Sequence, residues 1–183
     1  GVMKGILDGV RILDLSQFLS GPHATLLLAG MGAEVIRIDN PATGDALSNA
    51  PVFYGADGPS LEKRAEDDLG IAFLKRLRAK KSITIDLKKQ EGHALFLRLV
   101  DKADVVVENF SVGVTKRLGI DWPRLKQVNP RLIHCSLTGY GSEGPDSANR
   151  GYDVTTQAMS GLMSITGQPG SPPTKAGSPL GDT

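Results

Sequence analysis

The sequence lacks the features that mark secreted, membrane-spanning or nucleic-acid-binding proteins. Its single cysteine, Cys135, excludes an intrachain disulfide and a multi-cysteine metal site. The longest apolar runs, such as Leu26–Ala29 and Val105–Val107, are far shorter than a bilayer span, and no basic-then-apolar signal pattern opens the chain. The formal net charge is only +1, which argues against a nucleic-acid or membrane-surface partner. We therefore expect a cytoplasmic protein with one good hydrophobic core.

Short catalytic and metal-binding motifs are also absent from the sequence. It contains no G-x-G-x-x-G, no P-loop, no H-E-x-x-H and no G-x-S-x-G. His23, His93 and His134 lack metal-ligand spacing, so no metal is expected. An unrelated doubly wound enzyme is disfavoured, because the usual phosphate fingerprint is missing after the first expected strand.

Residues 103–110, A-D-V-V-V-E-N-F, form the most informative stretch of the chain. The β-branched run Val105–Val107 is too apolar for a strand with one solvent-exposed face, so it predicts a central strand that is covered on both faces of the sheet. Polar residues resume at Glu108. Because ligands bind beyond the carboxyl ends of the strands in an open parallel sheet, we expect a site near Glu108, Asn109 and Phe110.

Hydrophobic periodicity predicts alternating strands and helices in the rest of the chain. Two β-α-β units with right-handed crossovers are therefore expected, which indicates an α/β fold with a mostly parallel sheet. Loops are expected at 40–59 and 167–179, where glycine, proline and small polar residues gather. Strands are expected at 10–15, 33–38, 82–87, 105–107 and 132–137, and helices at 23–29, 61–79, 89–102, 112–118, 122–128 and 152–165.

The chain reaches Asp182 and Thr183 after a loop rich in glycine, proline and serine. A compact domain rarely ends on an open loop with nothing to tie it down. We therefore expect residues 3–183 to form one α/β domain, truncated from a longer protein. Gly1 and Val2, ahead of Met3, are left out of this expectation as a foreign remnant.

Several short sequence blocks occur in a fixed order between about Leu7 and Asp182. They are L-D-G-V-R-I-L-D-L-S-Q-F-L-S-G-P, G-A-E-V-I-R-I-D, K-K-S-I-T-I-D-L-K, A-D-V-V-V-E-N-F, R-L-G, N-P-R-L-I-H-C-S-L-T-G-Y-G, G-Y-D and P-P-T-K-A-G-S-P-L-G-D. Each block alone is weak, but the ordered series resembles the class III coenzyme A transferases. This is also called the CaiB/BaiF family, after carnitine dehydratase and the bile-acid-inducible protein.

The resemblance implies the large domain of the class III CoA-transferase fold, which is a Rossmann-like open sheet with helices on both faces. It implies that a second, smaller domain lies outside this chain. It also implies coenzyme A and acyl-CoA as substrates, a carboxylic acid acceptor as the other partner, and interlocked homodimers at full length. On this resemblance the present chain alone is expected to be inactive.

Asp182, in the block G-S-P-L-G-D, matches the family's catalytic aspartate. The resemblance implies that its carboxylate attacks the acyl-CoA thioester and later carries CoA as an aspartyl thioester. The carboxylate must stay ionised to react, so a dry site needs dipoles or N–H groups that hold its charge. Outside the family context, an aspartate after a glycine is more often a solvated loop residue or a helix N-cap.

Further residues match family positions that contact CoA. Each has a plainer alternative, because the apolar ones fit a core, the arginines a solvated surface, the asparagine a turn and the tyrosine a helix start. The resemblance implies acyl-pocket contacts for Phe18 and Leu19, adenine contacts for Ile85 and Leu87, CoA contacts for Asn109 and Phe110, phosphate or pantetheine contacts for Arg117 and Arg150, and a place beside the thioester for Tyr152.

Position 152 bears on the choice between two activities of the family. The α-methylacyl-CoA racemases carry histidine there as an acid/base group, whereas this chain has Tyr152. A phenol with a pKa near ~10 is a poor base near neutrality, which favours the transferase. The racemase activity stays as one alternative, and a non-catalytic CoA-binding module stays as another.

Three departures from the family pattern bear on the substrates. Leu19 stands where formyl-CoA transferases have glutamine, which argues against oxalate handling. A basic residue that some members have near Asn40 is absent, and residues 55–78 fit the pattern poorly. Leu19, Ser20 and Tyr152 together suggest a moderately apolar acyl pocket.

Overall fold

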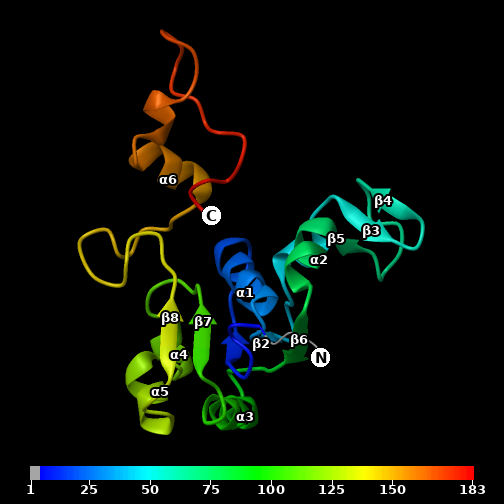
Figure 1. The fold of residues 1–183 in the computed structure, drawn as a ribbon, viewed down its shortest axis with the longest axis vertical. Helices are drawn as coiled ribbons and strands as arrows, with labels where there is room; N and C mark the ends of the chain where they lie inside the picture. Colours follow the sequence, from blue (N-terminus) through cyan, green and yellow to red (C-terminus); the bar gives the residue numbers. More distant parts are fainter. Residues whose placement is uncertain (1–4) are drawn as a thin grey trace.

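The computed structural model of the chain describes residues 5–183, so the expected domain start at residue 3 lies outside the described part. Strands and helices alternate along most of its length (Figure 1). The strands are β1 (Arg11–Asp14), β2 (Glu34–Asp39), β3 (Phe53–Gly55), β4 (Gly58–Ser60), β5 (Leu69–Gly70), β6 (Lys80–Thr84), β7 (Val105–Glu108) and β8 (Ile133–Ser136). The α-helices are α1 (Ser20–Gly30), α2 (Ile71–Leu77), α3 (Gln90–Val100), α4 (Val114–Leu118), α5 (Trp122–Val128) and α6 (Asp153–Met159), and 3-10 turns occur at Ala46–Asn49 and Leu162–Ile165.

A parallel sheet with the strand order β6-β2-β1-β7-β8 forms the centre of the described residues. β1 lies in the middle and pairs with β2 on one side and β7 on the other, so that Leu13 lies opposite both Ile36 and Val106. β7 is an interior strand between β1 and β8. The predicted α/β fold with an open parallel sheet is therefore confirmed.

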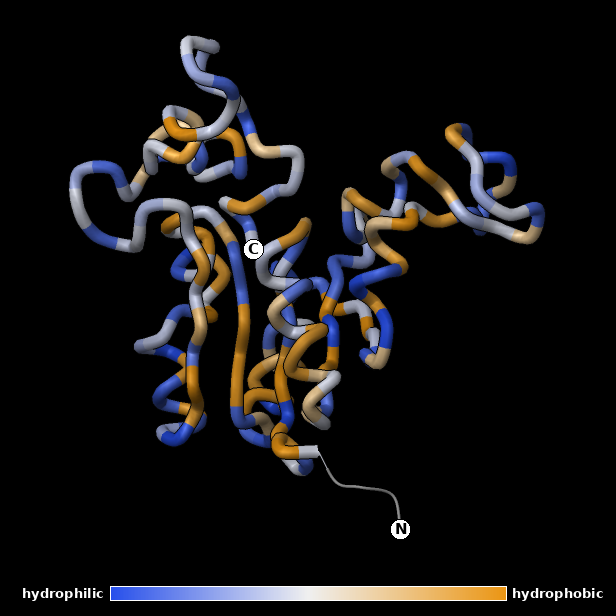
Figure 2. The backbone as a smooth tube through the Cα atoms, turned by 45° about the horizontal axis from the view of Figure 1, so that its top comes forward, coloured by the Kyte–Doolittle hydropathy of each residue, from blue (hydrophilic) through white to orange (hydrophobic). Residues whose placement is uncertain are grey.

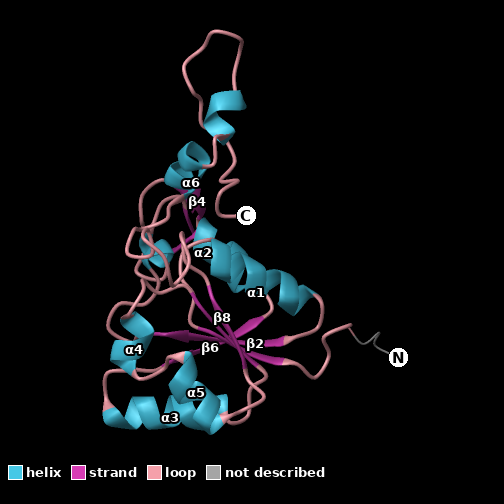
Figure 3. Cartoon of the chain, turned by 90° about the vertical axis from the view of Figure 1, so that its left-hand side faces the viewer, coloured by secondary structure: helices cyan, strands magenta, loops and turns pink. Residues whose placement is uncertain are grey.

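Helices cover both faces of this sheet (Figure 3). On one face, Phe96 of α3 and Leu125 of α5 belong to the same buried cluster as Leu13 of β1. On the other face, Leu28 of α1 packs against a second cluster that contains Val35 of β2. Apolar stretches accordingly follow the strands in Figure 2. Each such large apolar side chain contributes about 1.5–3 kcal/mol when it is fully buried.

The helix expected at 61–79 is wrong over most of its length. α2 begins only at Ile71, and the residues before it contribute to a small antiparallel sheet in the order β4-β3-β5. The buried carboxylate of Asp68 accepts hydrogen bonds from the backbone N–H groups of Arg64 and Ala65, which fixes a turn in place of helix. Gly70 then passes so close to Leu47 that a Cβ would lie 2.1 Å from its carbonyl oxygen.

Other boundaries also differ from the sequence-based expectation, two of them for a visible reason. β6 begins at Lys80, two residues before the strand expected at 82–87, because the Lys80 side chain is buried in the fold. The helix expected at 152–165 ends at Met159, and Gly161, with φ of +83°, breaks it before the 3-10 turn. None of the helices in residues 5–183 is long and apolar enough to cross a membrane.

Candidate active site

The loops after β1 and β7 separate at the carboxyl edge of the sheet. Chain connections run from β1 toward β2 on one side, while β7 lies on the other side of β1, so this edge is the point where the strand order reverses. Asn109 bridges the two loops, since its Oδ1 accepts from the Gln17 N–H at 2.9 Å and its Nδ2 donates to the Gln17 carbonyl at 2.7 Å. The expected ligand position beyond β7 therefore coincides with a switch point of the sheet.

Phe18 follows Gln17 and lies in a strained conformation. Its φ is +64°, which is uncommon for a bulky residue, and 54% of the residue is exposed. Strain of this kind costs on the order of 1–3 kcal/mol and clusters at binding sites, where surrounding contacts hold it. An exposed aromatic side chain beside the switch point suits the expected contact with a ligand.

A buried polar cluster of Asp14, Ser16, Thr25 and Lys80 packs beside the loop that follows β1. The carboxylate of Asp14, at the end of β1, accepts hydrogen bonds from the N–H and hydroxyl of Ser16 and from the Thr25 hydroxyl. Lys80 Nζ lies 3.0 Å from Asp14 Oδ2 and also donates to Thr25 Oγ1 at 2.7 Å and to the Pro22 carbonyl at 2.9 Å. The cluster joins β1, α1 and β6, and both charged side chains are fully buried.

The pKa of Lys80 is lowered, because burial, together with the positive charges of Arg37 and Arg76, outweighs the facing carboxylate of Asp14, which raises it. Sequence reasoning missed this residue as part of the site. Lys80 lies outside the strand expected at 82–87, and its local sequence carries no signal for burial.

The segment that ends in Asp182 lies beyond the carboxyl edge of the sheet, where the C-terminus is drawn in Figures 1 and 3. α6 holds it: Gly181 N–H donates to Asp153 Oδ1 at 2.8 Å, and Ala176 N–H donates to Gln157 Oε1 at 2.9 Å. Asp182 itself is partly buried, and its N–H donates to the Pro179 carbonyl at 3.1 Å.

Charges around Asp182 oppose one another. Burial, followed by the negative charge of Asp153, raises the pKa of Asp182, and the positive charge of Arg76 on α2 lowers it by a smaller amount. Arg76 is half-buried and donates to the Ala72 carbonyl of its own helix at 2.7 Å. Sequence reasoning missed Arg76, because residues 55–78 fit the family pattern poorly.

The expected adenine-side residues are mainly core residues in this structure. Ile85 is only 5% exposed and belongs to the large buried cluster, against which Leu87 also packs. Ile85 nevertheless borders a hollow of about 260 Å³. That hollow is lined by Thr84, Ile85, Asp86, Lys89, Glu91, Gly92 and Leu95.

The remaining expected contact residues lie at varied depths. Phe110 packs partly buried on the core, and its N–H donates to the carboxylate of the buried Glu108 at 2.8 Å. Arg117 and Arg150 are exposed, and Tyr152, just before α6, is 59% exposed. No hydrogen bond or ion pair within residues 5–183 joins either arginine to Asp182 or to the Asn109 bridge. The structure thus brings Asn109 and Phe18 together but not the arginines.

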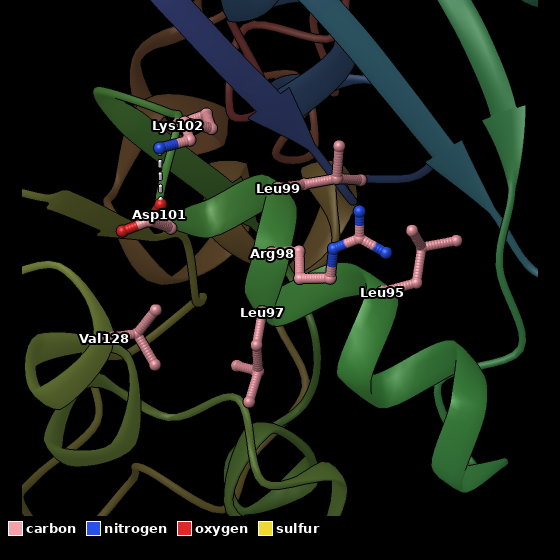
Figure 4. A pocket seen from close by; sticks show the side chains of 7 residues that line it. All are labelled: Leu95, Leu97, Arg98, Leu99, Asp101, Lys102 and Val128. Carbon is pink, nitrogen blue, oxygen red and sulfur yellow. Dashed lines mark ion pairs between the residues drawn. The ribbon is translucent and has the colours of Figure 1, made fainter.

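A larger hollow, of about 540 Å³, lies between α3 and α5 (Figure 4). Leu95, Leu97, Leu99 and Val128 line it together with the stem of Arg98 and the ion pair of Asp101 with Lys102. Asp101 and Lys102 lead into the start of β7, so this hollow is at the amino edge of the sheet, away from the switch point. In the part of the chain that the structure describes, no cluster of three potential metal ligands occurs.

The chain is similar to known proteins over nearly all of its length. Residues 7–183 match the family described as CoA-transferase family III. The chain is 44% identical to the succinate–glutarate CoA-transferase of Agrobacterium fabrum over 98% of its own length and 44% of that protein. It is 41% identical to the succinyl-CoA–L-malate CoA-transferase alpha subunit of Chloroflexus aurantiacus, over 96% of this chain and 39% of that one.

Solved structures of relatives have the same fold. A CaiB/BaiF family protein from Brucella suis superposes with a TM-score of 0.88 at 37% identity, over 98% of this chain and 46% of that chain. A protein from M. tuberculosis gives a TM-score of 0.83 at 34% identity, over 98% and 47% of the two chains. The chain thus spans less than half the length of these relatives, and it belongs to the class III coenzyme A transferase family.

Proposed function

We propose that this chain supplies the CoA-binding domain and the nucleophile of an acyl-CoA transferase. The full-length protein moves coenzyme A from an acyl-CoA donor to a carboxylic acid acceptor, with Asp182 as the covalent catalyst. The observation that carries the proposal is the family match over residues 7–183, which includes Asp182, together with the hydrogen bonds that tie the Asp182 segment to α6 beyond the carboxyl edge of the sheet.

The reaction divides one transfer into steps that balance without an external proton. An Asp182 oxygen attacks the thioester carbonyl, the C–S bond breaks, and CoA leaves as a thiolate, giving a mixed anhydride. The thiolate then attacks the Asp182 carbonyl, which releases the donor acid and leaves an aspartyl-CoA thioester. The acceptor carboxylate repeats the two steps in reverse, so that a new acyl-CoA forms and Asp182 is free again. A carboxylate suits this role because it is a nucleophile that becomes a good leaving group once acylated.

The surroundings of Asp182 support this role. Partial burial and the nearby charge of Asp153 raise its pKa, which makes the carboxylate more basic, while Arg76 favours its ionised form. A partly desolvated carboxylate is also less stabilised by water before it attacks. No metal takes part in the proposed steps.

Coenzyme A, as free CoA or acyl-CoA, is the proposed ligand of the switch-point loops. Phe18 and Asn109 border this position, and the exposed Arg117 and Arg150 have guanidinium groups free to approach anionic oxygens from the surface. The proposed contact set remains Phe18, Leu19, Ile85, Leu87, Asn109, Phe110, Arg117, Arg150 and Tyr152.

For the acceptor we propose a short dicarboxylic acid rather than the moderately apolar acyl group that the sequence suggests. Several relatives have names that include succinate or succinyl-CoA, glutarate, malate, mesaconate or oxalate, and each of these acids carries two carboxylates. Arg76 adds a half-buried positive charge close enough to Asp182 to influence it, and such a charge favours a second carboxylate over an apolar chain.

The whole protein also includes, in this proposal, the second smaller domain that the present chain does not contain. We propose that the full-length protein is a cytoplasmic homodimer and that the chain alone is inactive. Sedimentation of the full-length protein and an activity comparison with residues 1–183 test these two points.

A CoA-exchange assay tests the proposed activity. Full-length protein is incubated with succinyl-CoA and a panel of isotopically labelled mono- and dicarboxylic acids, and labelled acyl-CoA is measured. We expect label in a dicarboxyl-CoA and none with Asp182→Ala. Binding of CoA without any exchange would identify a non-catalytic CoA-binding module instead. Deuterium from solvent entering the α-position of a 2-methylacyl-CoA would identify the racemase activity.

A further inference from the structure

The segment that carries Asp182 has little structure of its own. Residues 171–181 form no helix or strand, and most of them are exposed. The place of Asp182 therefore depends on the few contacts that this segment makes with the rest of the chain. One of these contacts is a hydrogen bond from the Thr174 N–H to the Met163 carbonyl in the 3-10 turn, at 3.0 Å. Others converge on two side chains of α6, Asp153 and Gln157, which lie four residues apart and thus on the same face of the helix.

Gln157 is fully buried, and both the oxygen and the nitrogen of its side-chain amide make hydrogen bonds. Its Oε1 accepts from the Ala176 N–H at 2.9 Å, and its Nε2 donates to the Ser178 carbonyl at 3.3 Å. The same Nε2 donates to both carboxylate oxygens of Asp153, at 3.1 and 2.9 Å. A buried amide without hydrogen-bond partners would destabilise the fold, so these bonds hold the backbone at Ala176 and Ser178 in place.

Asp153 continues the same network to the residue before the nucleophile. Its Oδ1 accepts from Gly181 N–H at 2.8 Å, and its Oδ2 lies 3.4 Å from Lys175 Nζ at the other end of the segment. Gly181 also touches the helix directly, because a Cβ there would lie 2.9 Å from Thr156 Cβ and 3.0 Å from the Asp153 carbonyl oxygen. Asp153 and Gln157 thus hold the segment at Lys175, Ala176, Ser178 and Gly181, in addition to the Thr174 backbone contact.

We propose that Gln157 and Asp153 are positioning residues that set where the Asp182 carboxylate stands relative to the thioester. The inference rests on the proposed role of Asp182, because it concerns the placement of that nucleophile. A displacement of about 1 Å at a reacting group lowers a rate by as much as about 100-fold. Loss of the Gln157 contacts therefore lowers kcat by about 10- to 100-fold. KM for acyl-CoA changes little, because the substitution leaves the loops after β1 and β7 unchanged, and we propose that these loops bind CoA.

The test uses Gln157→Met in the full-length protein, since methionine keeps the length of the side chain and removes the hydrogen bonds of Gln157 to Ala176 and Ser178. Gly181→Ala is the second variant, because it leaves the sequence of α6 unchanged and its added methyl group pushes the segment away from the helix. Gln127→Met is the matched control: this glutamine of α5 is exposed, and its side chain accepts a hydrogen bond from Arg124 at 3.3 Å. Single-turnover formation of the Asp182–CoA adduct, steady-state kcat and KM, and Tm are measured for each.

We expect adduct formation and kcat to fall at least 10-fold in Gln157→Met and Gly181→Ala, with KM for acyl-CoA within about threefold of wild type and Gln127→Met unchanged. Wild-type rates in both variants overturn the inference while leaving the transferase proposal intact. A parallel loss of CoA binding in both overturns it as well, because it indicates a general structural role. If the wild-type protein forms no adduct, the proposed function itself fails.

Discussion

Replacement of Lys80 by methionine tests the buried cluster that supports the switch-point loop. The Lys80 and Asp14 side chains are both fully buried, and Lys80 Nζ donates hydrogen bonds to Asp14, Pro22 and Thr25. Lys80→Met fills nearly the same volume but removes the only cation in contact with the buried Asp14 carboxylate within residues 5–183. The perturbation therefore isolates the ion pair from packing.

The expected loss follows from these contacts. Removing one member of a buried ion pair leaves an uncompensated charge and costs about 3–5 kcal/mol. The lost bonds to the Pro22 carbonyl and Thr25 hydroxyl are part of this cost, and the new apolar burial offsets some of it. We expect Lys80→Met to lower the free energy of unfolding by about 3 kcal/mol or more, which is a large share of the typical 5–15 kcal/mol of a folded protein.

The next residue supplies a matched control on the same strand. Lys81 pairs with Glu34 at the surface, and 70% of its side chain is exposed, so Lys81→Met is expected to cost less than about 1 kcal/mol. Urea denaturation followed by helical circular dichroism compares the two variants. Equal losses for the two lysines, or a loss below about 1 kcal/mol for Lys80→Met, would refute the reasoning.

Three further predictions concern the site itself. Asp182→Asn raises Tm at pH 7 and leaves it unchanged well below the ordinary Asp pKa of 3.8, because a raised pKa means that folding disfavours the charged carboxylate. Arg76→Gln removes the charge that lowers the pKa of Asp182, so the acid limb of the kcat/KM profile moves to higher pH. Asn109→Ala leaves the Gln17 backbone unpaired, which costs about 1–3 kcal/mol of stability and raises KM for acyl-CoA.

Each of these predictions has a contradicting result. A Tm for Asp182→Asn that falls at pH 7 would mean that the carboxylate is stabilising in its charged form. An acid limb that stays in place or moves to lower pH in Arg76→Gln would mean that Arg76 does not act on Asp182. An unchanged KM in Asn109→Ala, at unchanged stability, would mean that the bridge to Gln17 does not shape the CoA site.

Local patterns were enough for most of the large sheet. The run Val105–Val107 predicted a buried strand, and apolar residues at helical spacing predicted α3, because each pattern reports burial directly. The candidate site beyond the carboxyl end of β7 was inferred from the parallel order of the strands, and the hydrogen bonds between Asn109 and Gln17 lie at this position.

Residues whose partners are distant in sequence were harder to predict. Lys80 is 66 residues from Asp14, so its burial depends on the pairing of β6 with β2, which no local pattern contains. The early end of the helix expected at 61–79 depends on Asp68 and on the approach of Gly70 to Leu47. The contacts of Gln157 with Ala176 likewise appear only when α6 and the last segment are packed together.

Mass spectrometry of the full-length protein tests the central claim most directly. The protein is incubated with a panel of acyl-CoAs, the intact mass is measured, and the adduct is mapped by peptide. The account predicts an increase equal to CoA less one water, located on Asp182 and absent from Asp182→Ala. An adduct on another carboxylate, or CoA exchange that persists in Asp182→Ala, would contradict the assignment of Asp182 as the nucleophile.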